Sequence, residues 1–338
     1  MLWTAWVAML AVGSGWAAEL SALNAAIEDA DKQDIVAVYV EQHGEPVVVR
    51  QLRPGATRDG EGHPELHDIR SAGKSLTALA VGAAIADGAL GSVDAPVWPL
   101  LGVATPEGLD DVRVRDLLSM SSALDCNDGD RRSPGQEERM YRRRDWTRFV
   151  ARLPRDPAYA RDAQGVGRFS YCTAGVLLLG QVVEKAVGEP FDVYVGRRIL
   201  APLGVDAVRW RRSRSGEVQS GGQLEIGAAS LARVGRMVLD HGMWAGEPVV
   251  PAAWVDEMLT ARHQLGPHGG YGYLWWFFEM RVNGESFEVW AMMGNGGNIV
   301  ALSPKRDAVV VVQSAAYNRS DARENSMRLV GIALASLD

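Results

Sequence analysis

The sequence predicts an α+β protein in which strands from both ends of the chain form one antiparallel sheet. Strand-like segments lie near the N-terminus and again beyond residue 270, whereas the long middle of the 338-residue chain alternates between helical segments and loops. Strands so far apart form one sheet only if the middle is inserted as a unit. We therefore expect a sheet subdomain from about 19–70 and 265–338, and a mainly helical subdomain from about 71–264.

Turn residues and hydrophobic periodicity indicate the first elements. We expect one helix and two strands before residue 60: Glu19–Asp31, Ile35–Val40 and Pro46–Leu52. The segment Ser71–Ala86 is almost entirely small or apolar and stops at Asp87-Gly88. A helix without a polar face is buried on all sides, so this helix should lie in the core.

The pattern changes from helical to extended toward the C-terminus. Four helices are predicted in the second half of the middle region: Ala174–Val187, Asp192–Leu200, Ser230–Leu239 and the segment from Pro251 to Leu259. Four strands follow: Tyr271–Met280, Phe287–Met293, Asn298–Leu302 and Ala308–Ser314. Asp321–Leu337 then closes the chain as a helix.

The composition is typical of a globular protein. Hydrophobic residues make up 47% and charged residues 23%, which excludes wholesale disorder. With 42 acidic and 35 basic side chains the net charge is −7, so we expect no general attraction to nucleic acid. No run of about 18 apolar residues follows residue 20, so we expect a soluble protein with no internal membrane span.

The first residues have the character of an export signal. Met1 to Ala18 is apolar, carries no charged side chain and ends in small residues. We predict that residues 1–18 are removed as a signal peptide and that the protein is periplasmic or secreted. The usual basic residue before the apolar run is missing, so an N-terminal helix that packs on the domain is the alternative.

A serine and a lysine three positions apart open the buried helix. Residues at this spacing lie one above the other, with about 5–6 Å between Cβ atoms. Burying the Lys74 ammonium removes its solvation and favours the neutral amine, which can take the proton of Ser71. The helix N-terminus also favours negative charge. The alternative is a capping serine and a solvated lysine, but Lys74 is the only charge in this helix before Asp87.

Three other kinds of site fail on spacing. Gly73-Lys74-Ser75 resembles the end of a phosphate-binding loop, but Asp68 stands where that loop requires glycine, so nucleotide binding is a remote alternative. A nucleophile elbow requires glycine two residues before the serine, where this chain has Ile69. The six histidines lack metal-binding spacing, and two distant cysteines do not make a zinc site.

Ser71–Lys74 with its apolar helix resembles the serine β-lactamase and penicillin-binding-protein superfamily, in particular the class C-like serine hydrolases and esterases. Further stretches similar to that family lie in order along the chain: Val114–Ser122, Phe169–Gly175, Leu177–Gly180, Tyr271–Trp276 and Gly294–Gly297. The resemblance implies the β-lactamase/D,D-peptidase-like fold over residues 19–338, with an antiparallel sheet, flanking terminal helices and a helical subdomain. It implies no metal or organic cofactor.

The resemblance implies a role for each matching residue. Ser71 attacks a carbonyl carbon and becomes acylated, and Lys74 accepts its proton or holds the tyrosine as phenolate. Tyr171 passes the proton to the leaving group and then activates the deacylating water. The backbone N–H groups of Ser71 and Asn298 form the oxyanion hole. From the residues alone, Tyr171 is equally typical of a core aromatic residue.

Two departures from the family pattern bear on the substrate. Members that cleave β-lactams usually carry a lysine and a hydroxyl residue where this chain has Asn295 and Gly296, and an asparagine where it has Thr173. Neutral side chains hold a carboxylate less well, so hydrolysis of a small ester or amide is favoured. Gly296 and Gly297 allow close backbone approach to an acyl group, although Asn-Gly-Gly is also typical of a plain hairpin turn.

Two other functions stay open. One is a β-lactamase or D,D-peptidase that acts on β-lactams or cell-wall peptides. The other is a binding or sensor protein on the same fold that acylates without turnover. A pure binder does not require Ser71, Lys74 and Tyr171 together, which favours the enzyme.

Cys126 and Cys172 are the only cysteines. The second lies beside Tyr171, and the loop around the first follows the segment that lines the same pocket in the family. In an exported protein they can form one disulfide that pins this loop to the site; two separate thiols are the alternative.

Arg131 to Arg155 contains nine arginines against Glu137, Glu138 and Asp145. A solvated face with ion pairs is the favoured interpretation. A rim that steers acidic substrates toward the site and a membrane-surface contact are the alternatives.

Overall fold

The computed structural model describes residues 14–30, 34–60, 62–282 and 284–337. Residues 1–13 of the expected export signal lie outside this part, and the first helix, α1 (Ser14–Ala30), begins five residues before the predicted start at Glu19. Among the described residues, no helix combines the length and apolar character that a membrane crossing requires.

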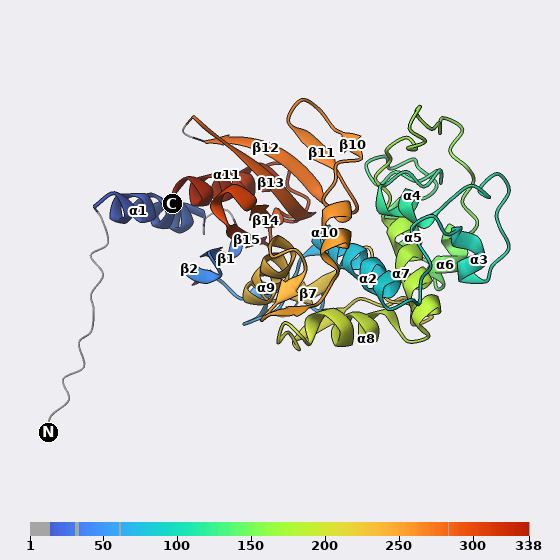
Figure 1. Ribbon diagram of the computed structural model, residues 1–338, viewed down its shortest axis with the longest axis horizontal. Helices are drawn as coiled ribbons and strands as arrows, with labels where there is room; N and C mark the ends of the chain where they lie inside the picture. The colour runs from blue at the N-terminus through green and yellow to red at the C-terminus, as the bar shows by residue number, and fades with distance from the viewer. Residues whose placement is uncertain (1–13, 31–33, 61, 283, 338) are drawn as a thin grey trace, which may run out of the picture.

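Eight antiparallel strands form the central sheet, in the order β10-β11-β12-β13-β14-β15-β1-β2 (Figure 1). Their bounds are β1 Ile35–Gln42, β2 Glu45–Gln51, β10 His263–Gln264, β11 Gly269–Tyr271, β12 Trp276–Val282, β13 Glu285–Gly294, β14 Asn298–Ser303 and β15 Ala308–Ser314. The first strand pairs with the last, with Val38 opposite Val312. Both ends of the chain therefore build one sheet, which confirms the predicted fold class.

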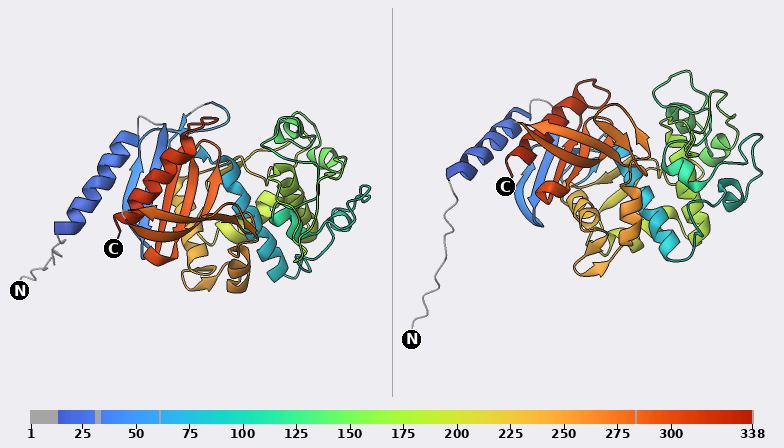
Figure 2. Two further views of the ribbon diagram at one scale, coloured as in Figure 1. Left: turned by 90° about the horizontal axis from the view of Figure 1, so that it is seen from above. Right: turned by 45° about the horizontal axis from the view of Figure 1, so that its top comes forward.

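Helices cover both faces of this sheet. Val310 and Val312 of β15 belong to the apolar layer that contains α1 and α11 (Ala322–Ala335), and Figure 2 shows these two helices on the outer face. Val309 and Val311 face the opposite layer, which contains α9 (Ala228–Leu239). A strand buried on both faces is continuously apolar, as β15 is. Helix α9 packs on the sheet although it lies within residues 71–264, the range expected for the helical subdomain.

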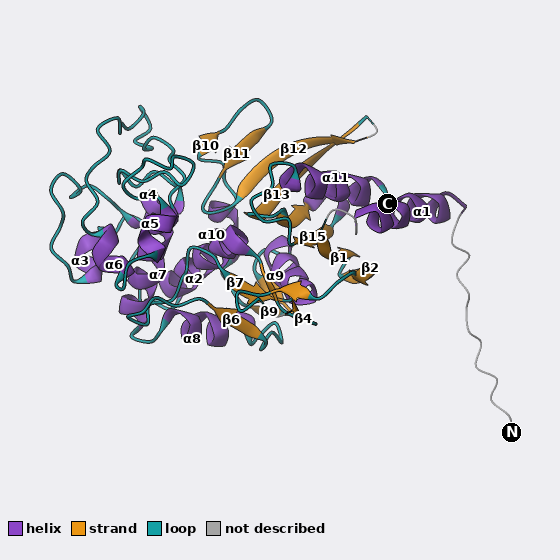
Figure 3. Ribbon diagram, turned by 180° about the vertical axis from the view of Figure 1, so that it is seen from behind, coloured by secondary structure: helices purple, strands orange, loops and turns teal. Residues whose placement is uncertain are grey.

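A mainly helical region adjoins the sheet (Figure 3). Its longest helices, α2 (Lys74–Ala86) and α7 (Thr173–Val187), pack against each other. The other helices are short: α3 Val97–Leu101, α4 Val114–Leu118, α5 Glu137–Tyr141, α6 Trp146–Val150, α8 Phe191–Val195 and α10 Ala252–Met258. The small strands are β3 Gly55–Ala56, β4 Gly62–His63, β5 His67–Asp68, β6 Val208–Trp210, β7 Leu224–Ile226, β8 Met243–Trp244 and β9 Glu247–Pro248.

Two predicted elements are broken by turns. The expected strand Tyr271–Met280 splits into β11 and β12, because the N–H of Gly272 donates to the Trp275 carbonyl (2.9 Å) and Leu274 has a φ of 59°. The expected helix Asp192–Leu200 is α8 followed by a π-helical turn, Gly196–Leu200. Both breaks depend on local backbone geometry that apolar periodicity does not record.

His67 joins the short strand before Ser71 to the end of β15. Its Nε2 donates to the Ser314 carbonyl (3.1 Å), while its Nδ1 accepts from the N–H of Ala56 (3.0 Å). These two partners select one neutral tautomer. Burial lowers the pKa of His67 to about 4, because the charged ring would lose its solvation.

We expect His67 to make the protein less stable as pH falls from its ordinary pKa of 6.5 toward 4. Over this range the unfolded ring takes up a proton that the folded ring does not, which costs about 2 kcal/mol at about pH 5. Urea unfolding of wild type and His67→Gln at about pH 7 and 5 measures the difference. The variant should lose about 2 kcal/mol less than wild type on acidification; an equal loss would contradict the prediction.

Candidate active site

Ser71 and Lys74 meet at the junction of a 3₁₀ turn and α2. The turn covers Arg70–Gly73, and α2 begins at Lys74. Lys74 is 1% exposed; its Nζ lies 2.8 Å from the Ser71 Oγ and donates to the Gly221 carbonyl (2.6 Å). The Gly221 carbonyl therefore fixes the buried amine, and the Ser71 hydroxyl is the other polar group beside it.

The backbone before Ser71 is strained and held by its neighbours. Arg70 has a φ of 53°, in the left-handed region that a non-glycine residue occupies at a cost of about 1 kcal/mol or more. Its N–H donates to Asp68 (2.9 Å), and its carbonyl accepts from the N–H of Gln223 (3.1 Å). A Cβ on Gly222 would lie 2.7 Å from the Arg70 carbonyl oxygen, so only glycine permits this approach.

Tyr171 lies immediately before α7 and reaches the same place. Its ring centroid is 5.0 Å from the Lys74 Nζ, and the ring stacks on Trp276 with centroids 5.9 Å apart. Tyr271 contacts it edge-on at 6.5 Å. The Tyr171 hydroxyl makes no hydrogen bond to any described residue, so it remains available to a substrate or to water. The structure therefore brings Ser71, Lys74 and Tyr171 together.

Asp128 anchors the backbone around Tyr171. Its N–H donates to the Tyr171 carbonyl (2.9 Å), and its two carboxylate oxygens accept from the N–H groups of Thr173 (2.7 Å) and Glu137 (3.1 Å). Burial and the neighbouring Glu137 raise the pKa of Asp128 to about 6, against an opposing effect of Lys74. The carboxylate thus ties the tyrosine segment to the start of α5.

A disulfide makes a second tie at the same place. Cys126 and Cys172 are bonded, with 5.4 Å between their Cα atoms. The Ser170 hydroxyl adds a hydrogen bond to the Cys126 carbonyl (2.7 Å). Of the two alternatives left open by the sequence, the structure has the single disulfide.

A small cavity of about 100 Å³ opens at Ser71. Its walls come from the serine turn, α5, the Gly221 loop and the end of β13: Arg70, Ser71, Glu137, Glu138, Tyr141, Gly221, Gly222, Gln223, Asn295, Tyr317 and Asn318. The one cation in this wall is already engaged, since Arg70 lies 3.5 Å from Asp68 and stacks over the Tyr317 ring. Two carboxylates and neutral amides therefore dominate the entrance.

The turn Asn295–Asn298 is only partly in the site. Asn295 lines the cavity and exchanges side-chain and backbone hydrogen bonds with Asn318. A Cβ on Gly296 would meet the Tyr317 ring at 2.7 Å and one on Gly297 the Ala322 carbonyl oxygen at 2.5 Å, so both glycines serve turn packing. None of Gly296, Gly297 and Asn298 lines the cavity at Ser71.

Asn298 has a structural role in this turn. Its side-chain amide donates to the Asn295 carbonyl (2.9 Å) and its oxygen accepts from the N–H of Ser314 (3.1 Å). The strand residue that touches the serine turn is Gly294, where a Cβ would lie 2.0 Å from the Ile69 carbonyl oxygen. The placement therefore favours the end of β13 over Asn298 as the strand side of an oxyanion hole.

Thr173 is buried behind the site. Its side chain packs against Gly221, where a Cβ would lie 2.8 Å from the Thr173 Cγ2. Its hydroxyl has no hydrogen-bond partner among the described residues. It supports the loop that holds Lys74 and does not line the cavity.

Several residues of the site were not predicted from the sequence. Gly221 accepts from Lys74, and Gly222 lies against Ser71; the Gly-Gly pair in a helical region was the available signal. Asp128 and Glu137 had none, since acidic residues in loops are ordinary. Their proximity to Lys74 depends on how the loop after Cys126 folds.

Comparison with known proteins assigns the chain to a family. The profile of the family described as Beta-lactamase matches residues 23–333, and the chain belongs to this family. A relative from Paenarthrobacter ureafaciens, named 6-aminohexanoate-dimer hydrolase, is 27% identical over 286 residues, which cover 79% of this chain and 69% of the relative.

Solved structures agree on the fold. The penicillin-binding protein from Bacillus halodurans has a TM-score of 0.68 at 21% identity, and covers 91% of this chain and 98% of its own. EstCE1, a hydrolase with promiscuous acyltransferase activity, has a TM-score of 0.70 at 16% identity, with 96% and 99% covered. The resemblance inferred from the motifs is confirmed.

We expect loss of the disulfide to destabilise the protein by about 4 kcal/mol, because the bond closes a span of 46 residues. Urea unfolding of Cys126→Ala/Cys172→Ala measures this. The double variant also removes the Cys172 sulfur that accepts from the Gly175 N–H at the start of α7. Reduced wild type keeps both sulfur atoms and isolates the effect of the cross-link; equal stability of oxidised and reduced protein would contradict the prediction.

Proposed function

We propose that this protein is a serine hydrolase that cleaves an ester or amide bond of a small molecule through a Ser71 acyl-enzyme. The contact that carries the proposal is the 2.8 Å approach of the Lys74 Nζ to the Ser71 Oγ in a buried site. A weak nucleophile needs an adjacent base, and this lysine occupies that position. The Gly221 carbonyl accepts from the same Nζ (2.6 Å), which fixes the lysine nitrogen beside the Ser71 hydroxyl.

In acylation, Lys74 accepts the Ser71 hydroxyl proton while the Oγ bonds to the substrate carbonyl carbon. The resulting oxyanion needs two N–H donors. The backbone N–H groups of Ser71 and Asn295 make no hydrogen bond to described residues, and both residues line the same cavity. We therefore assign the oxyanion hole to these two groups in place of the pair with Asn298.

Collapse of the tetrahedral intermediate breaks the bond to the leaving group, which departs with a proton from Tyr171. Water then attacks the Ser71 ester and gives a proton to the Tyr171 oxygen, and Lys74 returns the proton it accepted to the Ser71 Oγ. Two observations support this proton path. The Tyr171 hydroxyl makes no hydrogen bond to a described residue, and the centroid of the Tyr171 ring lies 5.0 Å from the Lys74 Nζ.

The charges at the entrance favour uncharged or cationic substrates over carboxylates. Glu137 and Glu138 line the cavity, and Arg70 is engaged by Asp68. A β-lactam or a peptide terminus brings a carboxylate that meets no free cation in this wall. The relative named 6-aminohexanoate-dimer hydrolase and the structural neighbour EstCE1, a hydrolase with promiscuous acyltransferase activity, are consistent with small amide or ester substrates.

We expect a short-chain aryl ester to be hydrolysed at least a hundredfold faster than a chromogenic cephalosporin. Ser71→Ala should abolish the ester rate, because the described residues that line the cavity include no other serine, threonine or cysteine. Initial rates of both proteins on both substrates measure this. Ester activity that survives Ser71→Ala would refute the mechanism, and efficient cephalosporin turnover would favour the β-lactamase alternative.

Tyr171→Phe is the companion variant, since it keeps the ring that stacks on Trp276 and removes only the hydroxyl. An acyl-enzyme that accumulates in this variant, seen by mass spectrometry, supports Tyr171 as the base of deacylation. Long-lived acylation of the wild type with no steady-state product would favour the sensor alternative.

We also propose that the protein is exported. Its disulfide supports this, because such bonds persist in oxidising compartments. We expect the native protein to begin near residue 19, and Edman or mass-spectrometric determination of its N-terminus checks this. An intact Met1 in the native protein would refute signal removal.

A further inference from the structure

The arginines of the segment Arg131–Arg155 are almost all without acidic partners. Of the nine, only Arg155 forms an ion pair with a described residue, at 2.8 Å from Asp111. None of the three acids of the segment forms an ion pair with these arginines among the described residues: Glu137 and Glu138 line the Ser71 cavity, and Asp145 accepts from the backbone N–H of Arg148 at the start of α6. Apart from the pair of Arg155 with Asp111, the expected ion pairs along this face are therefore absent among the described residues.

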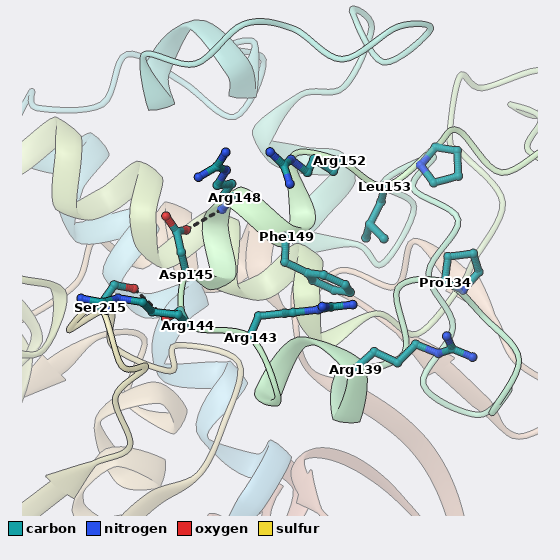
Figure 4. A pocket seen from close by; sticks show the side chains of 11 residues that line it. Pro134, Arg139, Arg143, Arg144, Asp145, Arg148, Phe149, Arg152, Leu153 and Ser215 are labelled. Atoms are coloured by element: carbon teal, nitrogen blue, oxygen red, sulfur yellow. Dashed lines mark hydrogen bonds between the residues drawn. The ribbon is translucent and has the colours of Figure 1, made fainter.

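Five of these unpaired side chains surround one hollow of about 830 Å³ (Figure 4). The arginines are Arg139, Arg143, Arg144, Arg148 and Arg152. Pro134, Phe149, Leu153 and Pro154 supply apolar wall, and Ser215 and Asp145 complete it. Arg143 lies over the Phe149 ring, 5.7 Å from its centroid, which directs its guanidinium across the hollow.

The backbone that carries these arginines is held firmly despite their mutual repulsion. The Glu217 carboxylate accepts from the N–H groups of Trp146 and Thr147, both at 2.7 Å. The Arg144 carbonyl accepts from the Ser215 hydroxyl (2.8 Å). Trp146 itself is 1% exposed and anchors α6 in the core. Like charges are thus kept together by contacts that do not neutralise them.

We propose that this hollow, which we term the arginine pocket, binds a ligand that carries two or more adjacent phosphate groups. Guanidinium groups pair with phosphate oxygens two at a time, so five of them match two or three phosphates, whereas a single carboxylate would leave most unpaired. The volume lies within the range of about 300–1,000 Å³ that is typical of small-molecule sites.

The arginine pocket is distinct from the Ser71 cavity. Helix α5 separates them: Glu137 and Tyr141 lie in the wall of the Ser71 cavity, while Arg139 lines the arginine pocket. The proposal does not depend on hydrolysis, so a catalytically inactive Ser71→Ala protein should bind the phosphate ligand as well as wild type.

Isothermal titration of the Ser71→Ala protein with inorganic tripolyphosphate at low salt tests the proposal. We expect saturable binding at one site, weakened at least tenfold by Arg143→Gln/Arg152→Gln. The matched control is Arg131→Gln/Arg132→Gln, which removes the same charge from unpaired arginines outside the pocket; it should weaken binding less than twofold. Melting temperatures of both double variants check that they fold.

No saturable binding, or equal weakening by the two double variants, would overturn the proposal. Co-sedimentation with phosphatidylcholine vesicles that contain a phosphatidylinositol bisphosphate distinguishes the source of the phosphates. Vesicle binding that tripolyphosphate displaces identifies a lipid headgroup, and tripolyphosphate binding without vesicle binding identifies a free ligand. Vesicle binding that Arg143→Gln/Arg152→Gln leaves unchanged would place it outside the pocket and count against the proposal.

Discussion

The burial of the Lys74 amine beside Ser71 is the constraint on which the rest of the site depends. An amine deprived of water needs a fixed acceptor, and the Gly221 carbonyl supplies one. That requirement explains why the Gly221-Gly222 loop presses against the serine turn, where a side chain on Gly222 would collide with Arg70. The two hydroxyl groups of the buried helix meet the same requirement, since Ser75 donates to the Leu274 carbonyl (2.7 Å) and Thr77 to the Ser220 carbonyl (2.7 Å). The strained Arg70 is retained because its neighbours hold both sides of its peptide.

The second half of the site is organised from the loop that follows Cys126. The disulfide and the Asp128 carboxylate fasten this loop to the residues on both sides of Tyr171. The same carboxylate reaches the start of α5, whose acids form one wall of the Ser71 cavity and whose Arg139 faces the arginine pocket. One short helix therefore separates an acidic entrance from a basic hollow. A chain of net charge −7 thus keeps a local cluster of arginines next to a cavity whose own wall carries two carboxylates.

Elements with a strong hydrophobic pattern were predictable, and those set by local backbone geometry were not. The strand Ala308–Ser314 was predicted with the bounds it has, because seven consecutive buried residues admit few alternatives. The expected strand from Tyr271 was wrong because Leu274 adopts a left-handed conformation that its residue type does not signal. The packing of α9 on the sheet could not be predicted either, because a stripe of apolar residues indicates that a helix is buried but not which surface covers it.

The sequence by itself determined the fold class and the family, and it predicted Ser71, Lys74 and Tyr171 as the candidate catalytic residues. Motif spacing and hydrophobic periodicity are local properties, so they can be read directly from the order of residues. Only the tertiary structure decided that Cys126 and Cys172 are bonded, that Asn298 supports a turn while Asn295 lines the cavity, and that five arginines share one hollow. Each of these depends on distances between segments far apart in the chain. Such distances are the outcome of packing the whole molecule, and no short window of residues contains them.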